Sequence, residues 1–245
     1  LALATFGHVS YQVVVEQREK KLIRQTFQQY VAPSVVDKML SLGELPSFGG
    51  ERKELSVLFS DIRNFTRFSE AHEPEVVAAR LSEYLSEMVE IIFRQGGTLD
   101  KFVGDAIMAI YGAPYYFEDH AERACRTALE MQQRLKELQK GWPDEPFARF
   151  NIGVGINTGQ AVLSSIGGAG YREYTAIGDS VNMAFRFESE SKKLGKDIVI
   201  GPDSYKHLPK NLWECGLQSV TVKGKSEPVS VWAITFGEID KVLSP

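Results

Sequence analysis

The sequence predicts a mixed α+β domain that follows a helical arm. Amphipathic helical stretches alternate with short apolar runs of strand length, glycine-rich turns separate these segments, and a long helical pattern precedes the first strand. Hydrophobic residues make up 43% and charged residues 24% of the 245 residues, so the composition is that of a globular chain rather than a disordered one. This length suits one large domain with an appendage, or two small domains.

The helical arm is predicted over residues 1–46. Apolar residues recur at helical intervals from Val9 to about Leu42, with charged residues between them. The helix is interrupted before Pro33, because proline disfavours helix in the residue that precedes it, and Ser34 is a suitable N-cap for the restart. The heptad pattern is too short to decide whether the arm pairs with a copy of itself or packs on its own domain.

The composition favours a cytoplasmic setting. No run of about 18 or more apolar residues is present, and two cysteines cannot form a disulfide framework or a zinc site. The opening residues LALATF are apolar and precede a polar stretch, which fits either the inner end of a membrane helix or a plain helix start. We therefore expect a cytoplasmic protein, or the cytoplasmic portion of a membrane-anchored protein with upstream sensor domains.

The domain is predicted over residues 47–245, beginning at a glycine-containing linker. Its first half contains an apolar strand, a core-facing helix that stops at Gly96-Gly97, a hairpin and a second amphipathic helix. The hairpin turn is Gly104-Asp105, so Asp105 lies at the hairpin tip. The predicted bounds are 54–59 for the strand, 73–95 and 120–140 for the helices, and 98–103 and 106–111 for the hairpin.

The second half of the domain contains mostly short strands. The predicted elements are strands at 150–157, 160–166 and 171–177, a helix at 179–194, a strand at 197–200, a helical turn at 203–207, and a closing hairpin of 219–222 with 229–235. This order favours a mixed sheet with helices on one face over a doubly wound sheet.

Two aspartates lie where strands end. Asp61 follows the first strand, and Asp105 lies at the tip of the hairpin. Carboxylates in such positions can hold magnesium ions, although many aspartates at strand ends only cap turns. The segment from Ile62 to Thr66 leads into a short helical turn, whose free backbone N–H groups suit a phosphate. Together these features indicate a metal site beside a phosphate site.

Asn182 and Arg186 are four residues apart and lie on one face of the predicted helix 179–194. The amide suits the orientation of a sugar, and the guanidinium suits the neutralisation of charge at a transferring phosphorus. Taken alone, the pair fits an exposed polar helix face equally well. No side-chain general base is apparent, because His72 and His120 are expected at the surface.

Three strings, in the order LFSDIRNFT, LDKFVGDAIMAIYG and YTAIGDSVNMAFRFES, resemble the catalytic domain of class III nucleotidyl cyclases. The likeness covers about Leu55 to Phe236 and includes a fourth motif, VKGK, near the C-terminus. It implies a ferredoxin-like βααββαβ-type fold with extra C-terminal strands. In that family the two aspartates hold metal ions, which implies two Mg²⁺ or Mn²⁺ per active site on Asp61 and Asp105.

The resemblance implies conversion of ATP into 3′,5′-cyclic AMP and pyrophosphate, with the ribose 3′-oxygen attacking the α-phosphorus. The Ile62 carbonyl would be a further metal ligand, and Phe65 and Thr66 would bind the substrate. One metal ion would lower the pKa of the 3′-hydroxyl and the other would neutralise the phosphates.

The other motif residues also receive roles from the resemblance. Asn182 would orient the ribose, and Arg186 would stabilise charge on the α-phosphoryl oxygens. A lysine of the VKGK string, Lys225 or else Lys223, would contact the terminal phosphates.

Lys101 and Thr175 are the purine-reading positions that the resemblance implies. Lysine can only donate hydrogen bonds and threonine can donate or accept, so together they can address the N1 acceptor and the 6-amino donor of adenine. Members of the family that use GTP typically carry an acid in place of Lys101, so the chain resembles an adenylate cyclase. The threonine at position 175 matches a subclass that includes bicarbonate-responsive members, and regulation by bicarbonate stays open.

The resemblance also implies a homodimer with two shared active sites, because in that family the metal residues and the purine residues come from different chains. The arm would then change how the two domains meet. A net charge of −4 argues against nucleic acid as a partner. The alternatives are a guanylate cyclase and a non-catalytic nucleotide-binding domain with a regulatory or dimerising role.

Overall fold

The computed structural model describes residue 18 and residues 50–142, 149–168, 171–208, 216–222, 226–235 and 237. The chain divides into two units, Leu1–Pro46 and Ser47–Pro245. Within the predicted arm only Arg18 is described, in a helix, so the role of the arm stays a prediction. Among the described residues, no helix has the length and apolar character needed to cross a bilayer.

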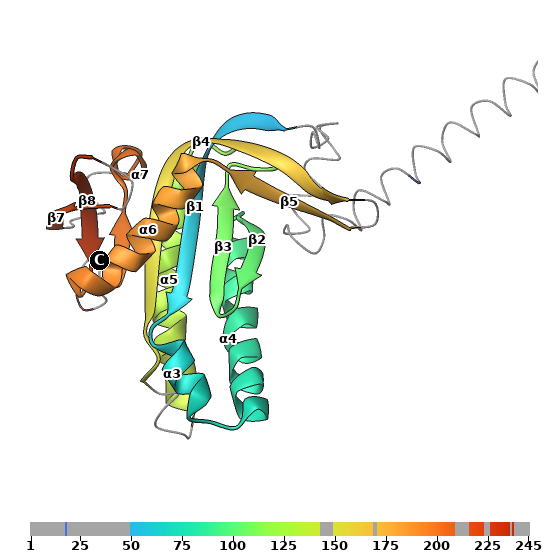
Figure 1. Cartoon of the computed structure of the whole chain (residues 1–245), viewed down its shortest axis with the longest axis vertical. Coiled ribbons are helices and arrows are strands. Elements are labelled where there is room, and N and C mark those ends of the chain that lie inside the picture. The colour runs from blue at the N-terminus through green and yellow to red at the C-terminus, as the bar shows by residue number, and fades with distance from the viewer. Residues whose placement is uncertain are drawn as a thin grey trace, which may run out of the picture. The chain divides into compact units, whose positions relative to one another are not determined.

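The second unit is an α+β domain built on one mixed sheet (Figure 1). Its elements are β1 (Glu51–Ile62), α3 (Phe65–Glu70), α4 (Pro74–Arg94), β2 (Thr98–Val103), β3 (Ala106–Tyr111), α5 (His120–Gly141), β4 (Ile152–Gly168), β5 (Tyr171–Ile177), α6 (Asp179–Leu194), β6 (Ile198–Ile200), α7 (Pro202–Lys206), β7 (Gly216–Val220) and β8 (Val229–Ile234). The strands are ordered β2-β3-β1-β4-β6-β8-β7, and β5 pairs with β4 beside this path. The predicted α+β class is confirmed.

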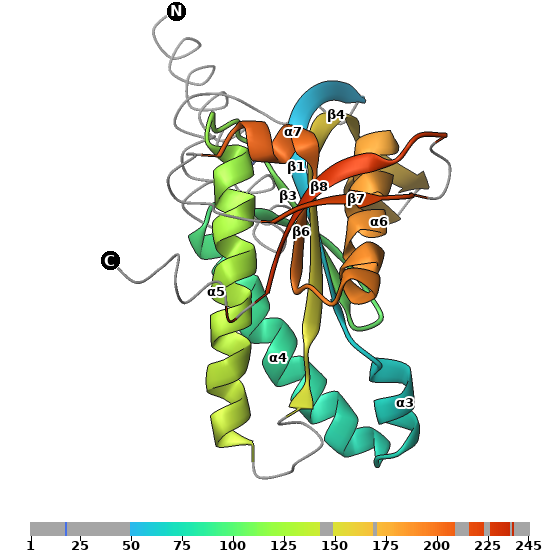
Figure 2. The ribbon, with the colours of Figure 1, turned by 90° about the vertical axis from the view of Figure 1, so that its left-hand side faces the viewer.

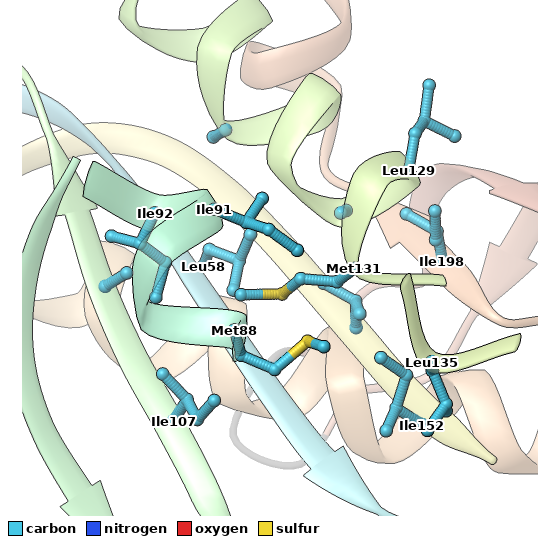
Figure 3. Packing of buried hydrophobic residues seen from close by; sticks show 14 of the residues in the cluster. Leu58, Met88, Ile91, Ile92, Ile107, Leu129, Met131, Leu135, Ile152 and Ile198 are labelled. Atoms are coloured by element: carbon cyan, nitrogen blue, oxygen red, sulfur yellow. The ribbon is translucent and has the colours of Figure 1, made fainter. Parts of the chain in front are cut away.

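The main core lies between the sheet and the helices α4 and α5 (Figure 2). Leu58 of β1 and Ile152 of β4 meet Met88 of α4 and Met131 of α5 there, and all four side chains are buried (Figure 3). Removing a side chain of this size from water stabilises the fold by roughly 1.5–3 kcal/mol. The helical periodicity of the two segments therefore reflects a shared apolar interface.

Helix α6 covers the opposite face of the sheet, so the expectation that all helices share one face is wrong (Figure 2). Along β4, Ile152 and Val154 point into the core beneath α4 and α5, whereas Gly153 and Gly155 face α6. A Cβ on Gly155 would lie 2.1 Å from the backbone nitrogen of Glu188. The glycines therefore allow α6 to lie directly against the strand.

The strands predicted at 150–157 and 160–166 form one continuous strand, β4. Its antiparallel pairing with β1 runs from Glu51 to Ile62 and includes the Leu55–Gly159 pair, where a break was expected. A long partner strand thus keeps the backbone extended through residues that favour a turn in isolation. The far part of β4 pairs with β5, and this two-stranded ribbon extends beyond the rest of the sheet (Figure 1).

The hairpin of β2 and β3 has the predicted bounds. Gly104 adopts a φ of 66° in the turn, a left-handed conformation that is unfavourable for residues with a Cβ. Helix α4 likewise ends before Gly96, whose φ is 75°. Glycine placement therefore explains why these two boundaries were predictable.

His120 is buried, with 1% of its surface exposed, so its expected position at the surface is wrong. Ser56 Oγ lies 2.8 Å from His120 Nδ1 and so gives the buried ring a polar partner, and the same hydroxyl lies 2.6 Å from Thr158 Oγ1. Burial lowers the pKa of His120, and the nearby His207 lowers it further. His72 is half-buried, and its ring stacks on Phe68 with centroids 4.2 Å apart.

Candidate active site

Asp61 and Asp105 lie together where β1 ends and the β2–β3 hairpin turns. The backbone N–H of Ile62 donates a hydrogen bond to Asp105 Oδ2 at 3.2 Å, which fixes the hairpin tip against the end of β1. A cavity of about 340 Å³ opens at this point. Its lining includes every predicted metal ligand and the predicted substrate residues Phe65 and Thr66, and consists of Asp61, Ile62, Asn64, Phe65, Thr66, Arg67, Asp105 and Lys192.

The charges at this cavity suit a bound cation. Burial raises the pKa of Asp105 to about 7, with the hydrogen bond and negative charge of Asp61 adding to the rise and the Ile62 N–H opposing it. A divalent cation between the two carboxylates would remove this repulsion. No group of three or more His, Cys, Asp or Glu side chains in the described part of the chain could hold a metal. Further ligands would therefore be main-chain, substrate or water oxygens, which Mg²⁺ accepts.

Glu188 of α6 is a third carboxylate near the pair, and sequence reasoning missed it. Burial raises the pKa of Glu188 to about 7, and the charges of Asp61 and Asp105 contribute to this shift. Its Oε1 lies 2.8 Å from where a Cβ on Gly153 would be, so the absence of a side chain at 153 makes room for the carboxyl. Only the packing of α6 on β4 brings Glu188 here, and its position in the sequence carries no signal of that.

Arg63 joins the segment after Asp61 to the C-terminal end of α6. Its Nη2 donates to Ser191 Oγ at 3.3 Å and to the Lys196 carbonyl oxygen, and lies 3.9 Å from Asp197 Oδ1. Its Nε is buried without a hydrogen-bond partner among the described residues. The guanidinium thus holds the segment that follows Asp61 against the end of α6, a contact between residues far apart in the chain.

The raised pKa of Asp105 predicts an unusual pH dependence of stability. The folded protein binds a proton at Asp105 more tightly than the unfolded chain does. Protonation of Asp105 therefore adds to the free energy of unfolding at low pH, and this addition is lost as the pH rises from about 4 to 7. Asp105→Asn is therefore expected to stabilise the metal-free protein at pH 8 by about 1 kcal/mol, discounted for partial exposure, or roughly 2–4 °C in the unfolding midpoint. The gain should shrink at pH 5.

Thermal unfolding followed by circular dichroism at both pH values checks this expectation. Addition of Mn²⁺ at pH 8 should raise the unfolding midpoint of the natural protein and leave that of Asp105→Asn nearly unchanged, since the variant lacks one of the two carboxylates expected to bind the cation. A variant that is less stable than the natural protein at pH 8 without metal would contradict the account of the two carboxylates.

Lys101 and Thr175 lie on β2 and β5 and are joined by Asp100, which sequence reasoning missed. Asp100 accepts hydrogen bonds from Thr175 Oγ1 at 2.9 Å and from the Ala176 backbone nitrogen at 3.1 Å. Lys101 Nζ lies 3.5 Å from Asp100 and 2.8 Å from Glu173 Oε1. The structure therefore brings the two predicted purine-reading residues together around one buried carboxylate.

The charges of Asp100, Lys101 and Glu173 partly compensate one another. Burial raises the pKa of Asp100, and the hydrogen bonds that it accepts from Ala176, Thr175 and Lys101 oppose the rise. Burial by itself would lower the pKa of Lys101, but Glu173 and Asp100 outweigh it and the net shift is upward. Lys101 is thus a positively charged donor. The only sign of Asp100 in the sequence is that an acidic residue stands within the predicted strand TLDKFV.

Asn182 and Arg186 lie on α6 as predicted, but neither lines the cavity of Asp61 and Asp105. Asn182 is exposed and Arg186 is half-buried, with its Nη1 3.8 Å from Met183 Sδ. Lys101 and Thr175 are also outside that cavity's lining. The predicted site residues of one chain therefore fall into separate groups. Lys223 and Lys225 lie outside the described residues.

Comparison with known proteins identifies the domain. Residues 50–235 match the family described as the adenylate and guanylate cyclase catalytic domain. The chain is 37% identical over 174 residues to adenylate cyclase 1 of Rhizobium meliloti (strain 1021), covering 71% of this chain and 26% of that protein. It is 30% identical over 245 residues to the adenylate cyclase of Anabaena cylindrica, covering 95% and 47%. The chain thus spans less than half the length of either relative.

Solved structures agree with this match. The guanylyl cyclase Cya2 is 33% identical, with a TM-score of 0.69 over 76% of this chain and 93% of that one. The adenylyl cyclase CyaB from P. aeruginosa is 35% identical, with a TM-score of 0.68 over 76% and 95%. With its fold, its motif order and these likenesses in agreement, the chain belongs to the adenylate and guanylate cyclase catalytic domain family.

Proposed function

We propose that this chain is an adenylate cyclase that forms 3′,5′-cyclic AMP and pyrophosphate from ATP at a homodimer interface. A bond forms between the ribose 3′-oxygen and the α-phosphorus, and the bond from that phosphorus to the α,β-bridging oxygen breaks. The proton of the 3′-hydroxyl would leave to water. The product would serve as an intracellular signal.

Asp61 and Asp105 would hold the divalent cations, with the Ile62 carbonyl as a further ligand. Mg²⁺ or Mn²⁺ bound there supplies a lowered pKa for the 3′-hydroxyl and positive charge for the phosphates. The chain contributes a fixed pair of carboxylates, because the Ile62 N–H orients Asp105 at 3.2 Å. Phe65 and Thr66 line the same cavity and would contact the phosphate end of the substrate.

The choice of ATP rests on the hydrogen bond from Thr175 to Asp100. The Thr175 hydroxyl donates its hydrogen to Asp100 at 2.9 Å, so Oγ1 can offer only lone pairs to a ligand. An acceptor at this position matches the 6-amino donor of adenine, and the ammonium of Lys101 matches the N1 acceptor. Guanine presents the opposite pattern, an O6 acceptor and an N1–H donor, and would be mismatched at both positions.

A homodimer would complete each active site. Asn182 and Arg186 lie outside the metal cavity of their own chain, so we assign them to the partner's site, where Asn182 orients the ribose and Arg186 stabilises charge on the α-phosphoryl oxygens. Two-fold symmetry then gives two equivalent sites, each with the metal residues of one chain and the purine residues of the other.

Exposed apolar surface supports this assembly. A groove of about 590 Å³ between α4 and β2 is lined mainly by apolar side chains, including Leu85 and the 45% exposed Phe102. The β4–β5 ribbon exposes Ile166 and Ile177, at 46% and 48%. Apolar patches of this kind mark interaction surfaces, and a second copy of the chain could cover both.

The proposal is tested by competition between ATP and GTP in one reaction with the 245-residue chain and Mn²⁺. We expect cyclic AMP to be the main product at equal substrate concentrations. Cyclic GMP as the main product would show that the hydrogen-bonding roles given to Lys101 and Thr175 are wrong. A dimeric protein that forms neither product would overturn the cyclase proposal as a whole.

Thr175→Val is expected to reduce the preference for ATP. The substitution keeps the side-chain volume and removes the acceptor, so kcat/KM for ATP should fall about tenfold, the effect of losing one hydrogen bond of roughly 1–1.5 kcal/mol, with little change for GTP. Thr175→Ser keeps the hydroxyl and serves as the matched control. An unchanged ATP-to-GTP ratio in the valine variant would contradict the proposed contact.

A guanylate cyclase is the second candidate function, favoured by a specific contact. Glu173 places a carboxylate oxygen 2.8 Å from Lys101 Nζ, and a carboxylate near the base site could accept hydrogen bonds from guanine. The similar identities to a guanylyl cyclase and an adenylyl cyclase, 33% and 35%, do not favour either base. The same competition experiment separates the two candidates.

A further inference from the structure

Helix α6 presents a lysine to the metal cavity of its own chain. Lys192 lines this cavity together with Asp61, Asp105 and Thr66. It lies one helical turn after Glu188, whose pKa is raised in part by the charges of Asp61 and Asp105. Asn182 and Arg186 project from a different side of the same helix, because at about 100° per residue the mean direction of positions 182 and 186 lies about 120° from that of positions 188 and 192.

The contacts of Lys192 hold its ammonium group at the edge of this cavity. Its Nζ donates to Asn64 Oδ1 at 3.2 Å. Asn64 adopts a left-handed conformation with a φ of 61° and does not use its side chain to cap α3, which leaves the amide oxygen directed at Lys192. Nearby, Arg63 binds Ser191 Oγ and the Lys196 carbonyl, so the end of α6 is tied to the segment that follows Asp61.

Lys192 is also electrostatically available. It forms no ion pair with any carboxylate in the described ranges, whereas the adjacent Lys193 pairs with Glu190 at 2.6 Å. Its one described bond is to a neutral amide. The ammonium of Lys192 lies beside two carboxylates that suit divalent cations. A triphosphate bound to those cations would carry excess negative charge there, and the ammonium would attract it.

We propose that Lys192 binds the β- and γ-phosphates of the nucleotide held by the Asp61 and Asp105 of the same chain, and stays in contact with the pyrophosphate product. This inference deepens the proposed function and rests on it for the identity of the substrate. When the bond from the α-phosphorus to the bridging oxygen breaks, negative charge grows on the leaving pyrophosphate, and the ammonium stabilises it. Lys192 is thus a substrate-binding residue on the chain that holds the metals.

Calorimetric binding of inorganic tripolyphosphate in the presence of Mn²⁺ tests the contact without any chemical step. The natural chain is compared with Lys192→Gln, Lys192→Arg and the matched control Lys193→Gln. We expect Lys192→Gln to weaken tripolyphosphate binding about tenfold, as for one hydrogen bond to a charged group, Lys192→Arg to restore most of it, and Lys193→Gln to stay within about twofold. Binding of AMP, which has no terminal phosphates, should not change.

Equal weakening by Lys192→Gln and Lys193→Gln would overturn the proposal, because it would reflect general surface charge. Unchanged tripolyphosphate binding in Lys192→Gln would also overturn it. Cyclase assays of the same proteins separate this inference from the proposed function. If the natural chain makes no cyclic nucleotide but Lys192→Gln alone binds tripolyphosphate more weakly, the cyclase proposal fails and the role of Lys192 as a phosphate ligand stands.

Discussion

Replacing Asp61 with asparagine is expected to lower cyclic AMP formation from Mn²⁺-ATP by roughly a hundredfold or more. The substitution keeps the shape of the side chain and removes one of two negative charges at the metal cavity. Loss of metal-assisted stabilisation is worth several kcal/mol, and about 1.4 kcal/mol corresponds to a factor of ten in rate. Asp105→Asn should have an effect of the same order, because both carboxylates line one cavity.

Initial rates over a series of Mn²⁺ and ATP concentrations check this prediction. Asp203→Asn is the matched control, since Asp203 is an exposed carboxylate on α7 that pairs with Lys206 at 2.7 Å. It removes the same charge from the chain and should stay within about twofold of the natural rate, in line with the small worth of exposed ion pairs. Full activity in Asp61→Asn, or an equal loss in Asp203→Asn, would contradict the assignment of the metal site.

Mixing two inactive variants should restore activity if each active site is shared. Asp61→Asn lacks one of the two carboxylates proposed to hold the metal ions, and Arg186→Ala is expected to lose roughly a hundredfold or more in rate, as is usual when one donor to the developing charge is removed. In an equal mixture about half of the dimers combine the two variants, and each of these has one intact site of two. The mixture should therefore reach about a quarter of the natural rate.

The mixture is measured against each variant alone at the same total protein concentration, after time for exchange of subunits. A second mixture, of Asp61→Asn with Asp105→Asn, provides the control. Both of these substitutions affect the metal residues, so every dimer lacks an intact metal pair and no recovery is expected. Recovery in the control mixture, or none in the first mixture while the variants exchange subunits, would contradict the shared site.

The elements predicted correctly have causes that are local in sequence. The β2–β3 hairpin depends on the turn at Gly104-Asp105, and α4 and α5 depend on apolar periodicity and on flanking glycine or proline residues. Asp61 and Asp105 could be paired from sequence because each lies at the end of a predictable element. The resemblance to a known family added the order of the motifs and the roles of their residues.

What could not be predicted depends on contacts between distant residues. The continuous strand β4 follows from its pairing with β1, and the position of α6 on the second face follows from Gly153 and Gly155. Neither effect is visible in a window of neighbouring residues. Because α6 packs there, Lys192 lines the cavity of Asp61 and Asp105, and Glu188 lies near enough for their charges to raise its pKa, although nothing in the local sequence marks either residue.

The hydrogen-bonding role of Thr175 also depends on a residue that is distant in the chain. From sequence its hydroxyl could donate or accept, so the prediction of adenine also needed Lys101 and the resemblance to the family. The carboxylate of Asp100, distant in the chain, accepts that hydrogen at 2.9 Å, so the hydroxyl is expected to act as an acceptor toward the base. Long-range packing thus turns an ambiguous residue into one with a defined preference.

Product analysis after incubation of the purified 245-residue chain with Mn²⁺ and ATP tests the central claim most directly. We expect cyclic AMP and pyrophosphate in equal amounts, formed by a dimer and almost absent with Asp61→Asn. Release of ADP and phosphate instead, or ATP binding by a dimer without any cyclic product, would contradict it.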